Sequence, residues 1–420
     1  MTTDPVVYTI ADTHLGLRER GWERSSDAPA VVAGFLRWLS RLPPAGEAIP
    51  VLEPVGIGTR TLKPLTHLIL LGDILELWDA ENQTVLLSAA SVVPFLASIQ
   101  GQIVYVLGNH DNILEESAGT YPISALSMSV VPNVFPLPGK DGIVEPLQIG
   151  DQSYVFVHGH QLDRHFMHAG RTWRLLGHLR HIGAALGSYA WVFFGLMLLA
   201  VLSVLIVAPV AAAWLLLVAL ILLFTPRAYM TVGRRLWRRL FGTRYRRSAA
   251  RDGFHRWWNR FREEVRLTAS LAVVFGHTHV LDWFEVDPPP KAPAVRPQRD
   301  LAADAPERRR EQAHAAYNIS SWISAGGGYE TVTSATLLYA DAEGPLFLGW
   351  DWNAKKPFHI PFEFVSLRPT RRLSSSEAEI AQRLGWPEKL IEKWSRTDEK
   401  ARTIWSARSE SRRLMHVQKT

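Results

Sequence analysis

The sequence predicts a mixed α/β fold in which two β-sheets pack as a sandwich, helices flank them, and a membrane helical hairpin is inserted into the chain. Three observations support this prediction. Short apolar runs typical of buried strands alternate with longer segments whose apolar residues recur at helical spacing. Several of these runs end in residues that bind metal ions well. One long run, 190–224, carries no charge at all.

Composition narrows the classes of protein that the chain can belong to. Its 420 residues are 47% hydrophobic, which suffices for a large core, or for a core plus a membrane element, and excludes a disordered protein. The chain has no cysteine, so disulfides and thiolate ligands are excluded. The absence of cysteine fits a reducing compartment, and any metal ligands must be Asp, Asn and His. The first strand-like run begins at Val6, so we expect no secretory signal before it.

Five polar motifs follow directly after strand-like apolar runs. In an open α/β sheet, ligands bind outside the carboxyl ends of the strands, so such motifs are expected to converge on one crevice. Residues two apart in an extended segment point to the same side. Asp12 and His14 in the first motif, and His277 and His279 in the last, are spaced in this way. The motifs are Asp12-Thr13-His14, Gly72-Asp73, Gly108-Asn109-His110-Asp111, His158-Gly159-His160 and Gly276-His277-Thr278-His279.

In this order the five motifs resemble those of the calcineurin-like metallophosphoesterase superfamily, over residues 6–350. The segment Gly72-Asp73-Ile74-Leu75-Glu76-Leu77-Trp78 is also similar to the GDxxExW form of the UDP-2,3-diacylglucosamine diphosphatase branch. The resemblance implies the superfamily's two-sheet sandwich and a metal-dependent phosphoric ester hydrolase. It further implies two divalent metal ions, for which the ligand types favour manganese, with iron and zinc as alternatives.

The resemblance also implies roles for individual residues. Asp73 would bridge the two ions, His110 would protonate the leaving group, and Glu76, where the superfamily usually has Asp, would orient His110. His160 and Asp163 receive no metal role. The first ion would be held by Asp12, His14, Asp73 and His279, and the second by Asp73, Asn109, His158 and His277.

The remaining segments are predicted from their periodicity and turn residues. Helices are expected over Ala30–Leu42 and Gln83–Ile99, and a loop or small hairpin over the Pro- and Gly-rich stretch Pro43–Pro64. Alternating apolar residues predict a hairpin that turns at Gly150-Asp151 and two antiparallel strands, Thr331–Tyr339 and Leu346–Trp350. Beyond Arg371, a helix opening near Ser376, interrupted at Pro387, is expected to continue to about Arg413.

The charge-free run Ala190–Phe224 is too long for one ordinary membrane span and long enough for two short ones, with a reversal near Pro209. His158 precedes the run and His277 follows it, so a shared metal site requires an even number of crossings. Arginines flank the run on both sides, and the positive-inside bias then puts both ends in the cytoplasm. We therefore expect a hairpin in the cell (inner) membrane with the catalytic domain on its cytoplasmic side.

The basic charge is concentrated around this run. Residues 164–268 contain 17 arginines, no lysine and three acidic residues, and Trp173, Trp237, Trp257 and Trp258 are interleaved with the arginines. This pattern predicts helices in the headgroup layer of an anionic phospholipid surface, with Arg171 and Arg174 as candidates for binding an anionic head group. Nucleic-acid binding is the less favoured interpretation, and burial of the apolar run in a homo-oligomer interface is a third.

These observations divide the chain into four segments. Residues 1–163 form the first part of the metallophosphoesterase core, 164–268 the basic helical insert with the hairpin, 269–370 the second part of the core with a loop at 287–313, and 371–420 a C-terminal helical extension. The expected function is hydrolysis of a phosphate or diphosphate ester of a membrane lipid or lipid-linked nucleotide. Two alternatives stay open: a membrane-anchored phosphatase, phosphodiesterase or nuclease for a soluble nucleotide, nucleic acid or phosphoprotein, and an inactive membrane scaffold.

Overall fold

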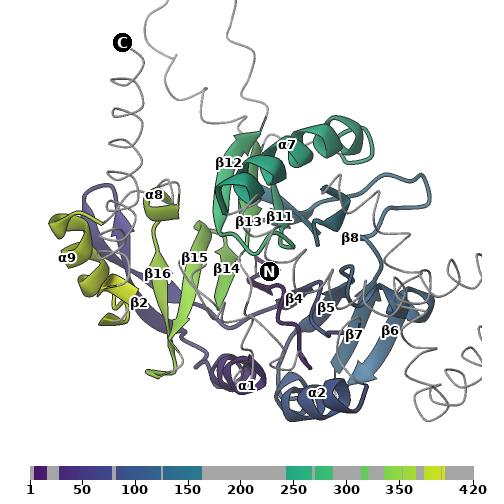
Figure 1. Cartoon of the computed structure of the whole chain (residues 1–420), viewed down its shortest axis with the longest axis horizontal. Coiled ribbons are helices and arrows are strands. Elements are labelled where there is room, and N and C mark those ends of the chain that lie inside the picture. The colour runs from purple at the N-terminus through teal and green to yellow at the C-terminus, as the bar shows by residue number, and fades with distance from the viewer. Residues whose placement is uncertain are drawn as a thin grey trace, which may run out of the picture. The chain divides into compact units, whose positions relative to one another are not determined.

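Two β-sheets with parallel strands at their centres form the core of the fold, which is mixed α/β (Figure 1). The chain divides into two compact units, Met1–Leu162 with Phe254–Thr420, and Asp163–Gly253. The sheets all belong to the first unit. The computed structural model describes residues 4–16, 28–77, 82–123, 126–162, 243–266, 270–286, 314–319, 322, 335–351, 353–365, 373–388 and 390–392.

The larger sheet has the strand order β16-β15-β14-β1-β4-β5-β7-β6. Its parallel centre consists of β1 (Val7–Ile10), β4 (His67–Leu71), β5 (Gln102–Val106) and β7 (Leu126–Val131). Antiparallel strands extend it on both sides, namely β14 (Thr336–Asp341), β15 (Gly344–Asp351), β16 (Lys356–Ile360) and β6 (Gly119–Ile123). The carboxyl ends of β1, β4 and β5 therefore lie at one edge of this sheet.

The second sheet has the order β12-β13-β11-β10-β8, and β9 also pairs with β10. Its strands are β8 (Val134–Phe135), β9 (Leu147–Ile149), β10 (Gln152–Val157), β11 (Leu271–Phe275), β12 (Asp282–Val286) and β13 (His314–Asn318). Strands β10, β11 and β13 run parallel to one another. The predicted hairpin with its turn at Gly150-Asp151 is the β9–β10 pair.

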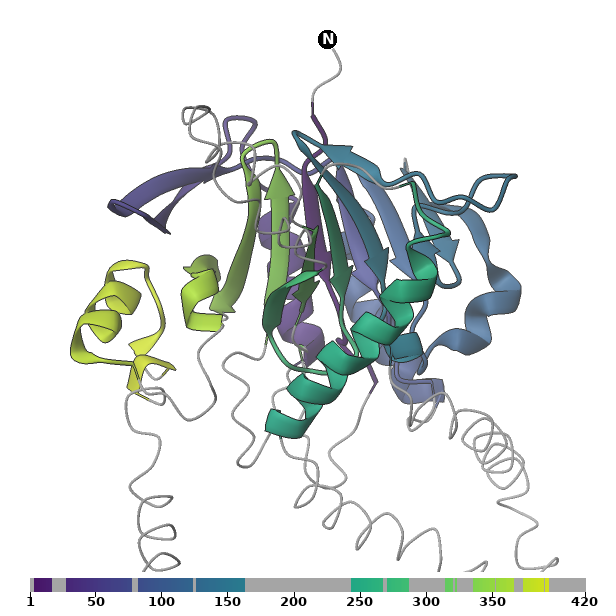
Figure 2. The same cartoon turned by 90° about the horizontal axis from the view of Figure 1, so that it is seen from above.

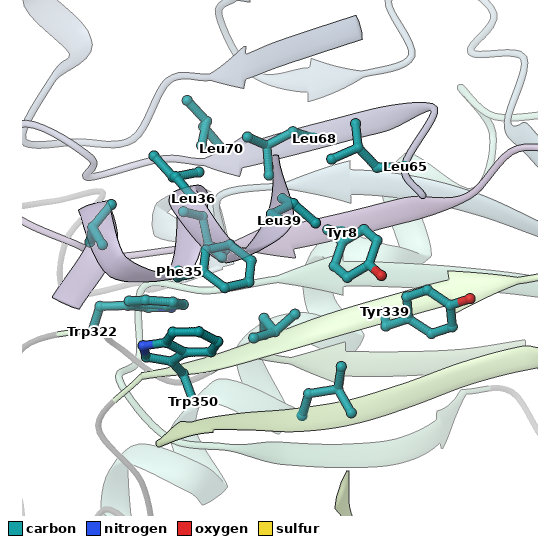
Figure 3. Packing of buried hydrophobic residues seen from close by; sticks show 14 of the residues in the cluster. Tyr8, Phe35, Leu36, Leu39, Leu65, Leu68, Leu70, Trp322, Tyr339 and Trp350 are labelled. Carbon is teal, nitrogen blue, oxygen red and sulfur yellow. The ribbon is translucent and has the colours of Figure 1, made fainter. Parts of the chain in front are cut away.

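The two sheets pack face to face, and helices cover their outer faces. Successive residues of a strand point to opposite faces of its sheet. In β1, Val7 therefore packs between the sheets, whereas Tyr8 and Ile10 pack under α1 (Ala28–Leu39) and α2 (Asn82–Leu96). Figure 3 shows this outer core, where Phe35 and Leu36 of α1 meet residues from both parts of the chain. On the second sheet, the part of α7 (Thr243–Phe261) from Phe254 onward supplies the cover, as Figure 2 shows from above.

Smaller elements complete the unit. The Pro- and Gly-rich stretch forms the hairpin β2 (Glu47–Glu53) and β3 (Gly56–Leu62). Short helical turns adjoin two of the polar motifs: η1 (Asn112–Ser117) follows Asp111, and η2 (His160–Leu162) begins at the last residue of its motif. After α8 (Phe362–Val365), the helix α9 (Ser375–Arg383) starts with a capping box in which Ser374 and Glu377 satisfy each other's backbone N–H groups. Trp386 then docks on β16 through Phe358.

The structure modifies the prediction for the basic segment. Trp258, expected at a membrane boundary, is buried in the core beside Phe254 and Phe261 of the same helix. No helix among the described residues is both long and apolar enough to cross a membrane, and the predicted hairpin at 190–224 lies outside those residues. The predicted loop at 287–313 and the tail beyond residue 392 lie outside them as well.

Candidate metal centre

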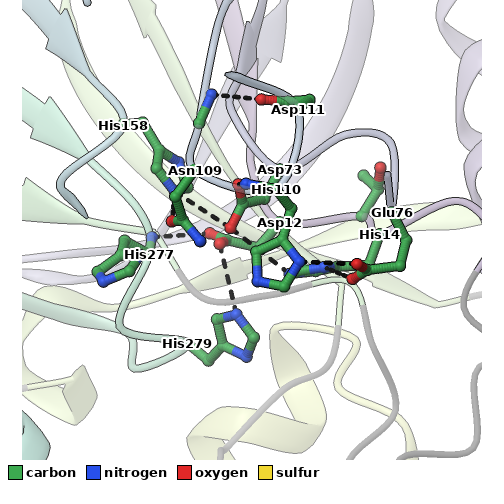
Figure 4. A network of polar contacts seen from close by, with 12 residues as sticks. Asp12, His14, Asp73, Glu76, Asn109, His110, Asp111, His158, His277 and His279 are labelled. Carbon is green, nitrogen blue, oxygen red and sulfur yellow. Dashed lines mark hydrogen bonds and ion pairs between the residues drawn. The ribbon is translucent and has the colours of Figure 1, made fainter. Parts of the chain in front are cut away.

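The five polar motifs meet where the parallel strands of both sheets end. Asp12, Asp73 and Asn109 follow β1, β4 and β5 of the larger sheet, and His158 and His277 follow β10 and β11 of the second sheet. Figure 4 shows these side chains turned toward one another, together with those of the remaining motif residues. Parallel strands deliver their carboxyl ends to one edge, so the strand order itself assembles the cluster.

Three groups of side chains in this cluster are close enough to hold metal ions, and in one of them, His14 with Glu76 and His110, the carboxylate already contacts both histidines. The other two are called the first and the second ligand group. In the first, ligand atoms of Asp12, His14 and His279 lie within 4.8 Å of one another. In the second, those of Asp73, His158 and His277 do. His279 Nε2 is 3.4 Å from Asp12 Oδ1, and His158 Nε2 is 3.2 Å from the Asn109 carbonyl oxygen. The structure thus brings all seven predicted ligands, Asn109 included, into one cluster.

Asp73 belongs to the second group and also approaches the first. Its Oδ2 atom is 3.9 Å from His14 Nε2 in the first group and 3.3 Å from His158 Nε2 in the second. Its Oδ1 atom accepts a hydrogen bond from the backbone N–H of His110, at 2.7 Å. One carboxylate thus faces both groups, which is the position that a bridging ligand occupies.

The hydrogen-bond partners of two histidines show that Nδ1 of each ring is a donor. His14 Nδ1 lies 2.8 Å from Glu76 Oε2, and His158 Nδ1 lies 3.0 Å from the carbonyl oxygen of Leu71. Because both partners accept hydrogen bonds, each Nδ1 donates, and each Nε2 is turned into the cluster, where it can bind a cation once it has lost its proton. Histidines that bind metals in proteins are held in this way by a carboxylate or a backbone carbonyl.

Distances and one unsatisfied atom fit a bound cation. Two ligands that are each about 2.1 Å from a shared ion lie roughly 3–4 Å apart, which is the range found in this cluster. His14 Nε2 is buried and has no hydrogen-bond partner among the described residues. A buried polar atom without a partner costs about 1–3 kcal/mol, and a metal ion would remove that cost.

The electrostatics of the cluster favour cations. Burial opposes ionisation, but the neighbouring histidines hold the pKa of Asp73 well below its ordinary value and also lower the pKa values of Asp12 and Glu76. In turn, burial lowers the pKa of His158, yet Asp73 and Asp12 outweigh it and raise the value to about 9. Three buried carboxylates therefore remain ionised and need positive charge beside them, from protons or from metal ions.

The backbone of the motifs is strained at the ligands. Asp12, His14, Asp73, His277 and His279 all have positive φ, between 44° and 68°. This conformation costs a residue with a side chain about 1–2 kcal/mol, and such strain concentrates at functional sites. Two glycines allow the close approach: a Cβ at Gly72 would lie 2.3 Å from the His158 ring, and one at Gly108 would lie 2.2 Å from Asp73 Oδ1.

Glu76 contacts two histidines at once. Its Oε1 atom is 2.8 Å from His110 Nδ1, while its Oε2 atom is 2.8 Å from His14 Nδ1. The contact with His110 matches the orienting role that the resemblance implied. The contact with His14 was not predicted, although the longer reach of Glu relative to Asp was a signal for it. Glu76 is buried, whereas the His110 side chain is 21% exposed and so lies at the open side of the cluster.

Two further residues near the cluster were given no role by sequence reasoning. Asp111, the last residue of its motif, accepts hydrogen bonds from the backbone N–H groups of Gly108 and Ile74 and from the hydroxyl of Tyr105, and so joins two of the loops. His160 lies beside the second group, with its ring centroid 5.6 Å from that of His158. Asp163 and the candidate head-group ligands Arg171 and Arg174 lie outside the described residues.

Comparison with known proteins adds no relative. No family model matches the chain, and no curated protein matches it. The ligands of the cluster and their mutual distances therefore carry the functional inference.

Proposed function

We propose that the protein is a metal-dependent phosphoric ester hydrolase with two divalent ions, manganese first and iron or zinc as alternatives. The observation that carries the proposal is that one buried carboxylate, Asp73, belongs to the second ligand group and also lies 3.9 Å from His14 of the first. Two divalent ions held by these groups would supply a water activated for attack and would stabilise the attacking and leaving oxygens of an in-line phosphoryl displacement.

His110 is suited to the proton transfer. Its Nδ1–H is directed at the Glu76 carboxylate, and in the protonated ring the Nε2–H can give its proton to the leaving-group oxygen. Burial and the two histidines keep Glu76 in place, and the hydrogen bond fixes the tautomer and the ring orientation of His110. Its partial exposure lets His110 reach a substrate from the open side, where His277 and His279 are also partly exposed, while the other five ligands stay buried.

We further propose that the substrate is a membrane lipid, or a lipid-linked nucleotide, with a phosphate or diphosphate head group. The charge-free run 190–224 and its basic flanks fall in the chain between His158 and His277, both in one ligand group. A membrane anchor for an enzyme with a soluble substrate could stand at either end of the chain and need not lie between two residues of the same ligand group. Moving a lipid chain into water costs about 0.8 kcal/mol per methylene, so a site held at the membrane avoids full extraction.

A hydrolysis assay in mixed micelles tests the proposal. Metal-free protein is given Mn²⁺ and either a lipid phosphate or diphosphate, or its soluble head-group analogue. Asp73→Asn is expected to lose more than about 100-fold in rate, because the substitution weakens both ligand groups at once. Asp151→Asn, an exposed aspartate in the β9–β10 turn, serves as the matched control and should keep its rate.

The outcomes separate the candidate functions. Faster turnover of the lipid than of the analogue supports the lipid substrate. Equal turnover of both favours the enzyme for a soluble phosphoester, with the apolar run as an anchor only. Hydrolysis that needs no metal, or that survives in Asp73→Asn, would refute the two-ion mechanism. Metal binding without any hydrolysis would favour the scaffold.

A further inference from the structure

A buried amide contacts the loop that carries two of the candidate ligands. Asn318 is the last residue of β13, paired with Phe275 at the end of β11, and is 1% exposed. Its Nδ2 atom donates to Thr278 Oγ1 at 2.6 Å. Thr278 stands between His277 and His279, which belong to different ligand groups. The amide therefore contacts the one residue that separates the two groups within this loop.

The two halves of the loop are held by different partners. In the first half, the N–H of Gly276 donates to the carbonyl of His158 at 2.8 Å, and the N–H of His277 donates to Asp12 Oδ2 at 2.9 Å. In the second half, the N–H of Val280 donates to Thr278 Oγ1 at 3.4 Å. The hydroxyl that Asn318 contacts thus also binds the residue after His279. Asn318 acts on the His279 half of the loop, and the His277 half has its own supports.

Asn318 is itself fixed by the chain that follows it. The N–H of Ile319 donates to the carbonyl of Phe275 at 2.7 Å, and the N–H of Trp322 donates to the carbonyl of Asp12 at 3.1 Å. The same short stretch therefore contacts the loops of Asp12 and of His279, which come from different sheets. These are two of the three residues of the first ligand group.

Packing alone does not explain why an asparagine stands at position 318. Asn318 Oδ1 is buried and has no hydrogen-bond partner among the described residues, which costs about 1–3 kcal/mol compared with a satisfied group. The bond to Thr278 is useful, however, because His279 has a φ of 56°, and a strained ligand persists only when its surroundings determine its position.

We propose that Asn318 is a positioning residue for one ion only. Through Thr278 it holds His279, and so it sets the affinity of the group formed by Asp12, His14 and His279, while the group around Asp73, His158 and His277 is independent of it. The inference rests on the proposed two-ion centre. It assigns to β13, which contributes no ligand, control over the occupancy of one of the two sites.

Metal titration of the full-length, metal-free protein tests the inference. Mn²⁺ binding is followed by the electron paramagnetic resonance signal of the free ion, which reports both stoichiometry and affinity. Asn318→Ala and Thr278→Val are each expected to weaken one ion about 10–100-fold and to leave the other unchanged. Thr278→Ser keeps the hydroxyl and should bind both ions as the wild type does. His279→Ala identifies the affected site, because it removes a ligand of the first group directly.

The result that overturns the inference is equally specific. Equal weakening of both ions by Asn318→Ala, or no weakening of either, contradicts it, as does a Thr278→Ser protein that behaves like Thr278→Val. Thermal unfolding of each metal-free variant shows whether the fold is intact, and if Asn318→Ala does not fold, the Thr278 pair decides. The readout is binding, so a wild type that binds two ions but hydrolyses no phosphoester counts against the proposed function alone.

Discussion

Buried histidines in this protein have pKa values shifted in opposite directions, and their neighbours decide the direction. Burial lowers the pKa of His158, but the carboxylates of Asp73 and Asp12 raise it to about 9. His359, in β16, is also buried, and burial together with the cation Arg60 lowers its pKa to about 4. His359 is therefore neutral, and its Nδ1 accepts a hydrogen bond from the N–H of Leu52 in β2.

His359 is expected to make the protein less stable in acid. Its pKa is about 6.5 in the unfolded chain and about 4 in the folded protein, so below pH 6.5 the unfolded state binds more protons. The stabilisation is complete above pH 6.5 and is lost as the pH falls to 4, by about 3 kcal/mol in total. His359→Asn, whose carbonyl can accept the same hydrogen bond, should lose less of its urea-unfolding free energy than the wild type between pH 7 and pH 4. An identical loss in both proteins would contradict this assignment.

At the scale of elements, charge patterns and core patterns overlap in α7. The segment is rich in arginine, yet Phe254, Trp258 and Phe261 recur at helical spacing and pack on the outer face of the second sheet. Arg256 and Arg260 are exposed on the same helix. An amphipathic helix can bury its large aromatic residues against the protein as well as in a headgroup layer. In α7, two of the tryptophans predicted for a membrane boundary differ in how deeply they are buried. Trp258 is 1% exposed, whereas Trp257 is only partly buried.

Substitution of the two tryptophans distinguishes their environments. Trp258→Ala should cost about 3–5 kcal/mol of unfolding free energy, because it removes a large side chain from a closed core. Trp257→Ala should cost clearly less, since that ring lies at the edge of the cluster and stacks on Phe261 at 4.3 Å. Urea unfolding of both variants measures the difference. Similar small losses for both would mean that α7 does not anchor to the sheet as described.

At the scale of the whole molecule, the candidate site depends on chain segments on both sides of the charge-free run. Asp12, Asp73 and Asn109 precede it and belong to the larger sheet, whereas His277 and His279 follow it and come from the second sheet. If 190–224 enters a membrane, it must return to the side from which it left, because both parts of the chain contribute to one cluster.

Topology reporters test this requirement. A reporter fused after Arg247 is expected to lie in the cytoplasm, since an even number of crossings precedes it and arginines flank both ends of the run. A reporter fused at Pro209, near the expected reversal, should instead be translocated and serves as the matched control. A translocated reporter after Arg247 would show that the hairpin topology, or the shared metal site, is wrong.

The residues of the candidate cluster could be chosen from the sequence because strand geometry is local. A buried strand is visible as an apolar run, and parallel strands deliver the polar residues that follow them to one edge. The apolar run that ends before Gly276 is strand β11, Leu271–Phe275, and the predicted helix Gln83–Ile99 overlaps α2. The first four residues of β13, 314–317, and the core face of α7 were missed. A short run after a Pro-rich segment and an arginine-rich helix both lack a clear local pattern.

By itself, then, the sequence determined which residue types stand at the ends of the strands, and with them the prediction of a metal centre built from Asp, Asn and His. Only the tertiary structure decided how these residues are supported. The carboxylate of Glu76 reaches His14 across 62 residues of sequence, and the amide of Asn318 reaches Thr278 across 40. Such contacts depend on the order and packing of two sheets, which the spacing of residues along the chain does not encode.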